Sequence, residues 1–115
     1  MTVKFFTDKP SALLAKFKAK IEIGNGAGGI SSWTFKDGAF YHKADELIDG
    51  AKVVAVALPS DKYPHLQFNV NRIGDKNVST HCYTELHGNL IATFIKHFSK
   101  DFTSAGVLSA YRKKS

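Results

Sequence analysis

Cysteine and long hydrophobic runs are scarce in this sequence. Cys82 is the one cysteine, which excludes an intramolecular disulfide and a zinc site built from several cysteines. No apolar stretch reaches the length of a membrane-spanning helix, and charge interrupts residues 1–8 before a secretory signal could form. We therefore expect a cytoplasmic protein with no membrane segment.

Acidic residues are also in the minority, with ten Asp and Glu against sixteen Lys and Arg. The resulting formal charge of +6 favours an anionic partner, either nucleic acid or an acidic protein. Hydrophobic residues make up 43% of the 115 positions, which excludes a disordered chain and is enough for one core. We expect a single domain over residues 1–115, with a frayed basic tail at 111–115.

Two segments have apolar residues at helical spacing. The first begins near Pro10 and ends at Gly24, although the alternation over 19–23 would also suit a strand. The second begins at Asn89 as a cap and extends along an apolar stripe to Phe102. We predict a helix in each segment, and a helical turn over 44–50 that ends at Gly50.

Strand patterns fill the region between these helices. Residues 33–35 and 39–42 flank a turn at 36–38, and the apolar run 52–58 is typical of a central strand buried on both faces. Residues 66–70 and 78–86 alternate and would form a hairpin that turns at 74–77. The sequence thus predicts an α+β domain with about five mainly antiparallel strands, packed by an N-terminal helix and a long C-terminal helix. The expected order, α-β-β-(short α)-β-β-β-α, is similar to that of profilin-like and roadblock-like domains.

The predicted hairpin would carry a polar strip on its outer side. A five-residue loop would place Asn71 opposite Ser79, and would also form the pairs Asn69 with His81, Gln67 with Tyr83, and His65 with Glu85. Cleavage of RNA beside a 2′-hydroxyl requires a general base, a general acid and a cation. The candidate catalytic residues for such a ribonuclease are His81, Tyr83, Glu85 and His65, with Arg72 as the cation. The alternative interpretation is that the strip has no catalytic role, because the solvent-exposed face of an antiparallel sheet normally carries polar residues.

Candidate binding residues come from three further patterns. Tyr41 lies between basic residues of the first hairpin, where it would stack on an unpaired base, whereas Trp33 and Phe35 share the side expected to be buried. The lysines of the first helix lie on its solvent-exposed side, and the polar strip contributes Asn69 and ends at the cation Arg72. The full set is Lys16, Lys18, Lys20, Lys36, Tyr41, Lys43, Asn69 and Arg72.

Neither a cofactor nor a metal is expected. Gly24, Gly26 and Gly29 have the spacing of a dinucleotide-binding loop, but this loop leads into a hairpin instead of a helix. His81 and Cys82 are consecutive in a predicted strand and would point to opposite faces. We expect histidines on the surface and a buried Cys82.

Three function classes follow. A non-enzymatic binding or regulatory domain fits best, because no constellation of residues meets the geometric demands of catalysis. A small metal-independent ribonuclease or toxin-like nuclease is the first alternative. The second is a homo-oligomeric structural domain, in which the apolar segment 107–111 docks on a second copy instead of packing back on its own chain.

Overall fold

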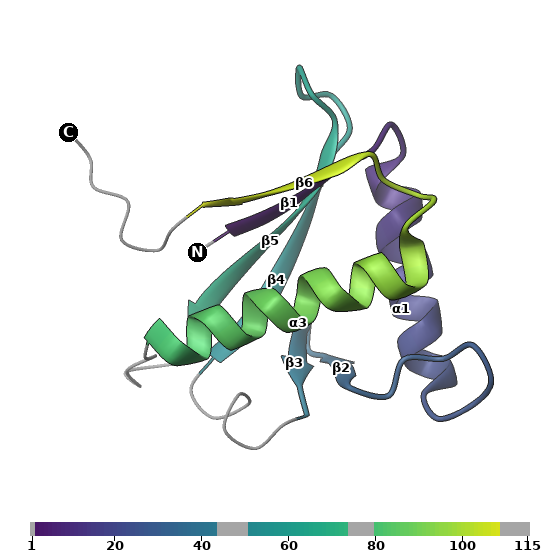
Figure 1. Ribbon diagram of the computed structural model, residues 1–115, viewed down its shortest axis with the longest axis vertical. Coiled ribbons are helices and arrows are strands. Elements are labelled where there is room, and N and C mark those ends of the chain that lie inside the picture. The colour runs from purple at the N-terminus through teal and green to yellow at the C-terminus, as the bar shows by residue number, and fades with distance from the viewer. Residues whose placement is uncertain (1, 44–50, 74–79, 109–115) are drawn as a thin grey trace.

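The computed structural model describes residues 2–43, 51–73 and 80–108. Six strands form one sheet, and two helices pack on one of its faces (Figure 1). The elements in chain order are β1 (Thr2–Phe6), α1 (Pro10–Ile23), β2 (Trp33–Lys36), β3 (Ala39–His42), β4 (Ala51–Leu58), β5 (His65–Arg72), α3 (Thr80–Phe98) and β6 (Ser104–Leu108). All neighbouring strands run antiparallel, in the order β2-β3-β4-β5-β1-β6.

The α+β class, the antiparallel sheet and both packing helices confirm the prediction from sequence. Helix α1 begins at Pro10, where a missing N–H is tolerated, and it includes the segment 19–23 that could also have been a strand. It ends at Gly24, which has a positive φ of 61° and donates its N–H to the carbonyl of Lys20 at 3.2 Å.

The first hairpin was also predicted correctly. Asp37 and Gly38 form its two-residue turn, with φ angles of 52° and 80°. Two positive φ values match the twist of the flanking strands, which is why glycine is favoured here. A Cβ at Gly38 would meet no atom within 4 Å, so the backbone conformation, and not the available space, requires this glycine.

The predicted strand over 78–86 is wrong, because Thr80–Phe98 is one continuous helix. Its buried hydrophobic residues recur every four positions: Cys82, Leu86, Leu90, Phe94 and Phe98. Asn89 does not cap a helix start but lies inside α3, where its Nδ2 donates to the carbonyl of Glu85 at 2.7 Å. Packing of this buried stripe against the sheet therefore outweighs the strand-like alternation over 78–86 and the low helix propensity of Gly88. The predicted turns at 44–50 and 74–77 lie outside the described residues.

Two strands were not predicted, and because the predicted strand over 78–86 is a helix, the count changes from five to six. Strand β1 lies between β5 and β6, with Val3 and Phe5 buried and the alternate residues on the other face. Strand β6 pairs with β1 from Phe6 opposite Ser104 to Thr2 opposite Leu108, so residues 104–108 pack back on their own chain. The first and last described elements are therefore strands, and the observed order differs from the predicted order on which the similarity to profilin-like and roadblock-like domains rested.

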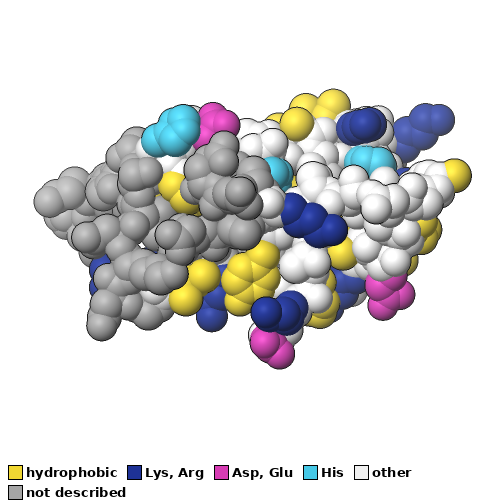
Figure 2. Space-filling model, turned by 90° about the horizontal axis from the view of Figure 1, so that it is seen from below, with side chains coloured by type: hydrophobic (Ala, Val, Ile, Leu, Met, Phe, Trp, Pro, Cys, Tyr) yellow, Lys and Arg dark blue, Asp and Glu magenta, His cyan; other side chains and the backbone are white. Residues whose placement is uncertain are grey.

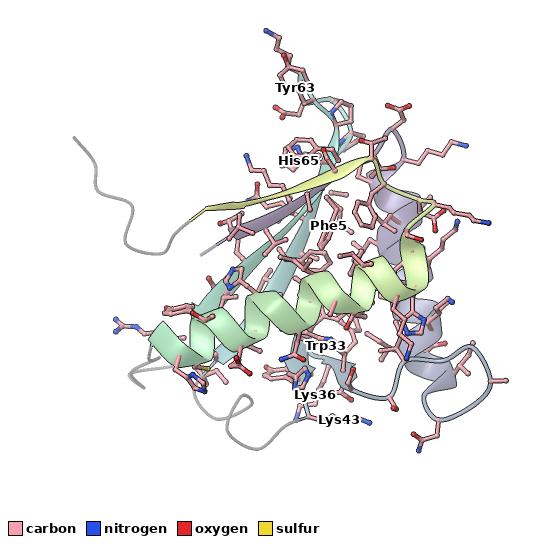
Figure 3. All side chains as sticks on the ribbon, in the orientation of Figure 1. Phe5, Trp33, Lys36, Lys43, Tyr63 and His65 are labelled. Carbon is pink, nitrogen blue, oxygen red and sulfur yellow. The ribbon has the colours of Figure 1, made fainter. Side chains whose placement is uncertain are left out.

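Aromatic rings join the sheet to both helices. Phe17 of α1 stacks on Phe40 of β3, with ring centroids 4.7 Å apart, and meets Phe94 of α3 edge-on at 5.0 Å. Phe5 and Phe68 complete the centre of this core, and all five rings are at most 1% exposed. Figure 3 shows Phe5 between the sheet and α3. Because this core lies on one side only, β4 is inner in the sheet but not buried on both faces as predicted; Val56 is 40% exposed.

Candidate binding surface

The predicted catalytic residues do not all come together, because only three of the four share an element. His81, Tyr83 and Glu85 lie on α3, whereas His65 lies on β5 with Phe6 and Leu58 as its cross-strand neighbours. The predicted pairing of β5 with residues 79–85 is wrong, because β5 pairs with β1 and β4. His65 lies near Tyr63, at the end of the molecule opposite Lys36 and Lys43 (Figure 3).

His65 is held as a structural group. It is 2% exposed, and its Nδ1 donates to the carbonyl of Tyr63 at 2.8 Å. Its Nε2 faces the Oε1 atom of Gln67 at 3.4 Å, and its ring centroid lies 5.5 Å from that of Phe6. Both ring nitrogens are therefore engaged within the fold.

The expectation that histidines lie on the surface is wrong for two more of them. His42 is buried edge-on against Trp33 at 4.9 Å, and the Nδ1 atom of buried His87 donates to the carbonyl of Tyr83 at 2.6 Å. Cys82 is buried as predicted, and this burial raises the pKa of its thiol. Among the described residues, no three His, Cys, Asp or Glu side chains are grouped as a metal site requires.

Each of the three lysines of α1 meets a different group. Lys16 forms an ion pair of 2.7 Å with Asp101, Lys18 lies 4.6 Å from the ring centroid of Phe35, and Lys20 lies 5.5 Å from that of Phe98. Lys16 and Lys20 are four residues apart and share a side of α1, whereas Lys18 lies two residues from each of them and does not. The predicted lysine row is therefore not a continuous basic surface, and Figure 2 shows basic side chains spread over the lower side of the molecule.

One face of the sheet is not covered by any described element (Figure 1). It consists of the even-numbered residues of β1, β2, β4 and β6 and the odd-numbered residues of β3 and β5, and we call it the open face. The pairing register fixes this assignment, since core residues Val3, Phe68 and Val53 occupy the alternate positions. Helices α1 and α3 both pack on those alternate positions.

The described side chains of the open face include cations but no anions. Lys4 of β1, Lys36 of β2 and Lys52 of β4 belong to it, and none of its residues is Asp or Glu. Valines of β4 lie between these lysines, with Val54 half-buried and Val56 exposed. Charges beside an apolar surface act on a ligand more strongly than charges in bulk water.

A hydrogen-bonded row of polar side chains occupies the centre of the open face. Asn69 accepts at Oδ1 from the hydroxyl of Thr2 at 2.8 Å and from Nε2 of Gln67 at 3.2 Å. These two bonds fix the plane of the Asn69 amide. Within the described part of the chain, the Nδ2 group of Asn69 makes no hydrogen bond, so it remains available as a donor.

Tyr41 is surrounded by basic positions on the open face. It lies opposite Thr34 of β2, which places Lys36 diagonally across the strand pair. The register set by Phe40 opposite Val53 makes Lys52 its neighbour on β4. Lys43 directly follows β3 and extends the ladder by donating its N–H to Ser32 at 2.9 Å. The predicted group of Tyr41, Lys36 and Lys43 thus gains Lys52.

Lys4 and Lys52 were not among the predicted binding residues. Lys4 alternates with two buried neighbours in β1, and this short pattern was the available signal. Lys52 stands at the start of a run interpreted as fully buried. Of the remaining predicted positions, Asn69 is central on the open face, whereas Arg72 is exposed at the end of β5 on the core side of the register.

A pocket of about 830 Å³ lies at the other end of the molecule. It is lined by the start of α1 and by the segments around Tyr63 and Phe102. Its charges are mixed, because Lys9, Lys16 and Lys100 are accompanied by two aspartates, one of them paired to Lys16. The pocket therefore has no clear preference for a charged ligand.

Comparison with known proteins gives no relative for this chain. No family model matches it, and searches of curated proteins and of solved structures found no match either. Within the described residues, no helix is both long enough and apolar enough to cross a bilayer.

Proposed function

We propose that this protein is a non-enzymatic binding domain that contacts an anionic partner through the open face. The observation that carries the proposal is a sheet face that no described element covers and whose described side chains include three lysines and no carboxylate. The net charge of +6 would favour approach of an anion from any side, and the open face would select where it docks. The candidate acid and base groups are divided between α3, which carries His81, Tyr83 and Glu85, and β5, which carries His65, and this gives a catalytic function less support.

The test is polyanion binding by two charge-matched triple variants. Lys4, Lys36 and Lys52 are changed to Gln in the first, and the exposed Lys9, Lys96 and Lys100, none on the open face, in the second. Both variants lose the same net charge. Single-stranded RNA and DNA, duplex DNA and a polyglutamate peptide serve as probes in a salt series.

We expect the open-face variant to bind at least tenfold more weakly at low salt. Its log–log salt slope should fall by about 0.7 to 0.9 for each lysine that contacts a phosphate. The control variant should change affinity less than about threefold. Equal losses in the two variants, or no polyanion binding at all, would reject the proposal.

Strand β6 supports a second candidate function, a homo-oligomeric structural domain. It lies at the edge of the sheet and its sequence, Ser-Ala-Gly-Val-Leu, has no charge or proline to discourage pairing. A second copy would add its own β6 antiparallel to this edge. Light scattering should then show a dimer that Ala105→Lys dissociates and Ala92→Lys on exposed α3 does not. A monomeric mass for the unaltered protein would reject this candidate.

A further inference from the structure

We infer that the anionic partner is a single-stranded nucleic acid that lies across the open face with one base stacked on Tyr41. This inference rests on the proposed function, and it names the partner. Tyr41 is the aromatic residue of the open face that combines a half-exposed ring with neighbouring cations. Stacking on an aromatic ring requires an unpaired base, which single strands provide.

The lysines around Tyr41 are placed to hold the phosphates on either side of the stacked base. Lys52 lies in the adjacent cross-strand position, where Cβ atoms are about 5 Å apart, and Lys36 is a diagonal neighbour at about 7 to 8 Å. Lys43 lies two residues along the chain and is exposed. A base on Tyr41 would therefore have a cation within reach in three directions.

The surface beyond Tyr41 can accept further nucleotides. Lys4 of β1 lies three strands from β3, a distance of about 14 Å at the usual strand spacing. Val54 and Asn69 lie opposite each other on β4 and β5, between Tyr41 and Lys4. A strand that runs from Tyr41 to Lys4 would therefore pass first an apolar side chain and then a fixed amide donor. The apolar side chain can contact a base face, and the Nδ2 group can donate to a base edge.

Three other occupants fit this face less well. A second copy would bring three lysines against three lysines with no carboxylate to compensate. A duplex is read by elements that enter a groove, and no described element projects from the open face (Figure 1). An acidic peptide would satisfy the lysines but has no planar base to stack on Tyr41. The single strand uses both features of the surface.

The experiment compares four labelled probes by fluorescence anisotropy at fixed salt. They are a 12-nucleotide single strand, an abasic strand of the same length and charge, the corresponding duplex, and a polyglutamate peptide. The variants are Tyr41→Ala and Tyr41→Phe, with Tyr63→Ala as a control because Tyr63 is 63% exposed and lies in the loop before β5. Thermal unfolding of each variant verifies that it folds.

We expect the single strand to bind more tightly than the abasic strand, and Tyr41→Ala to weaken only the former, by about 5- to 100-fold. Tyr41→Phe and Tyr63→Ala should stay within about threefold of the unaltered protein, since a phenyl ring still stacks. If Tyr41→Ala does not fold, the comparison of single and abasic strands in the unaltered protein decides.

The contrary outcomes separate the inference from the proposed function. Equal binding of the single and abasic strands, with no effect of Tyr41→Ala, would overturn the inference and leave a general anion-binding face. Tighter binding of polyglutamate or duplex would overturn it in favour of that partner. Absence of binding to every probe would reject the proposed function itself.

Discussion

Phe5 of β1 stacks on Phe94 of α3, with ring centroids 4.2 Å apart and an interplanar angle of 15°. This contact joins the fourth residue of β1 to the last third of α3, and the two residues are 89 positions apart in the sequence. It closes the core at the point where β1 lies between β5 and the edge strand β6. The fold therefore depends on a strand that the sequence pattern did not indicate.

Removal of the Phe94 ring should destabilise the protein strongly. Phe94 is fully buried and meets Phe5, Phe17 and Phe68, so Phe94→Ala should lower the free energy of unfolding by about 3 to 5 kcal/mol. Its neighbour Ile95 is 57% exposed, and Ile95→Ala should cost less than about 1 kcal/mol. Urea denaturation measures both values. Similar losses in the two variants would contradict this assignment of the buried stripe of α3.

Two glycines should respond to alanine in opposite directions. Gly38 has a φ of +80°, which an L-residue adopts at a cost, so Gly38→Ala should destabilise the protein by about 1 to 2 kcal/mol. Gly88 lies inside α3 with open space around an added Cβ, and Gly88→Ala should stabilise it by about 0.5 to 1 kcal/mol. The midpoints of thermal unfolding should therefore move apart. Stabilisation by Gly38→Ala would show that the turn adopts another conformation.

The same two glycines show which parts of the fold could be predicted. Asp37-Gly38 is a local signal, because a two-residue turn and its flanking strands need no distant partner. Gly88, beside Asn89, reads as a helix boundary, and only packing of Leu86 and Leu90 on the sheet keeps the helix continuous there. Strand β1 could not be identified locally, since five residues provide too little alternation. Its position between β5 and β6 is set by long-range pairing.

The candidate surface was predictable to a similar extent. Tyr41, Lys36 and Lys43 are close in sequence, so the hairpin pattern was sufficient to group them. Lys4 and Lys52 join them only through the strand order, which the sequence does not contain. The polar strip opposite β5 failed for the same reason, because its proposed partner residues belong to α3.

Stability should fall in mildly acidic solution because of His97. Burial lowers the pKa of this side chain below 6.5, and the charges of Lys20 and Lys96 lower it further. The unfolded chain then binds a proton more readily than the folded chain, so stability is lost as pH falls from about 6.5 through the folded pKa. His97→Gln should show a smaller loss than the unaltered protein between pH 7.5 and 5. Parallel pH profiles of the two proteins would contradict this role of His97.

A carboxylate placed in the centre of the open face should weaken nucleic-acid binding more than simple loss of the amide. Asn69→Ala removes the Nδ2 donor, whereas Asn69→Asp also introduces a negative charge among Lys4, Lys36 and Lys52. The additional loss in Asn69→Asp is electrostatic, so it should shrink as salt rises. Asn25→Asp makes the same charge change in an exposed loop outside the sheet and should alter the affinity for single-stranded RNA little. Equal effects of Asn69→Asp and Asn25→Asp would mean that total charge governs binding, and that the open face does not select where the strand lies.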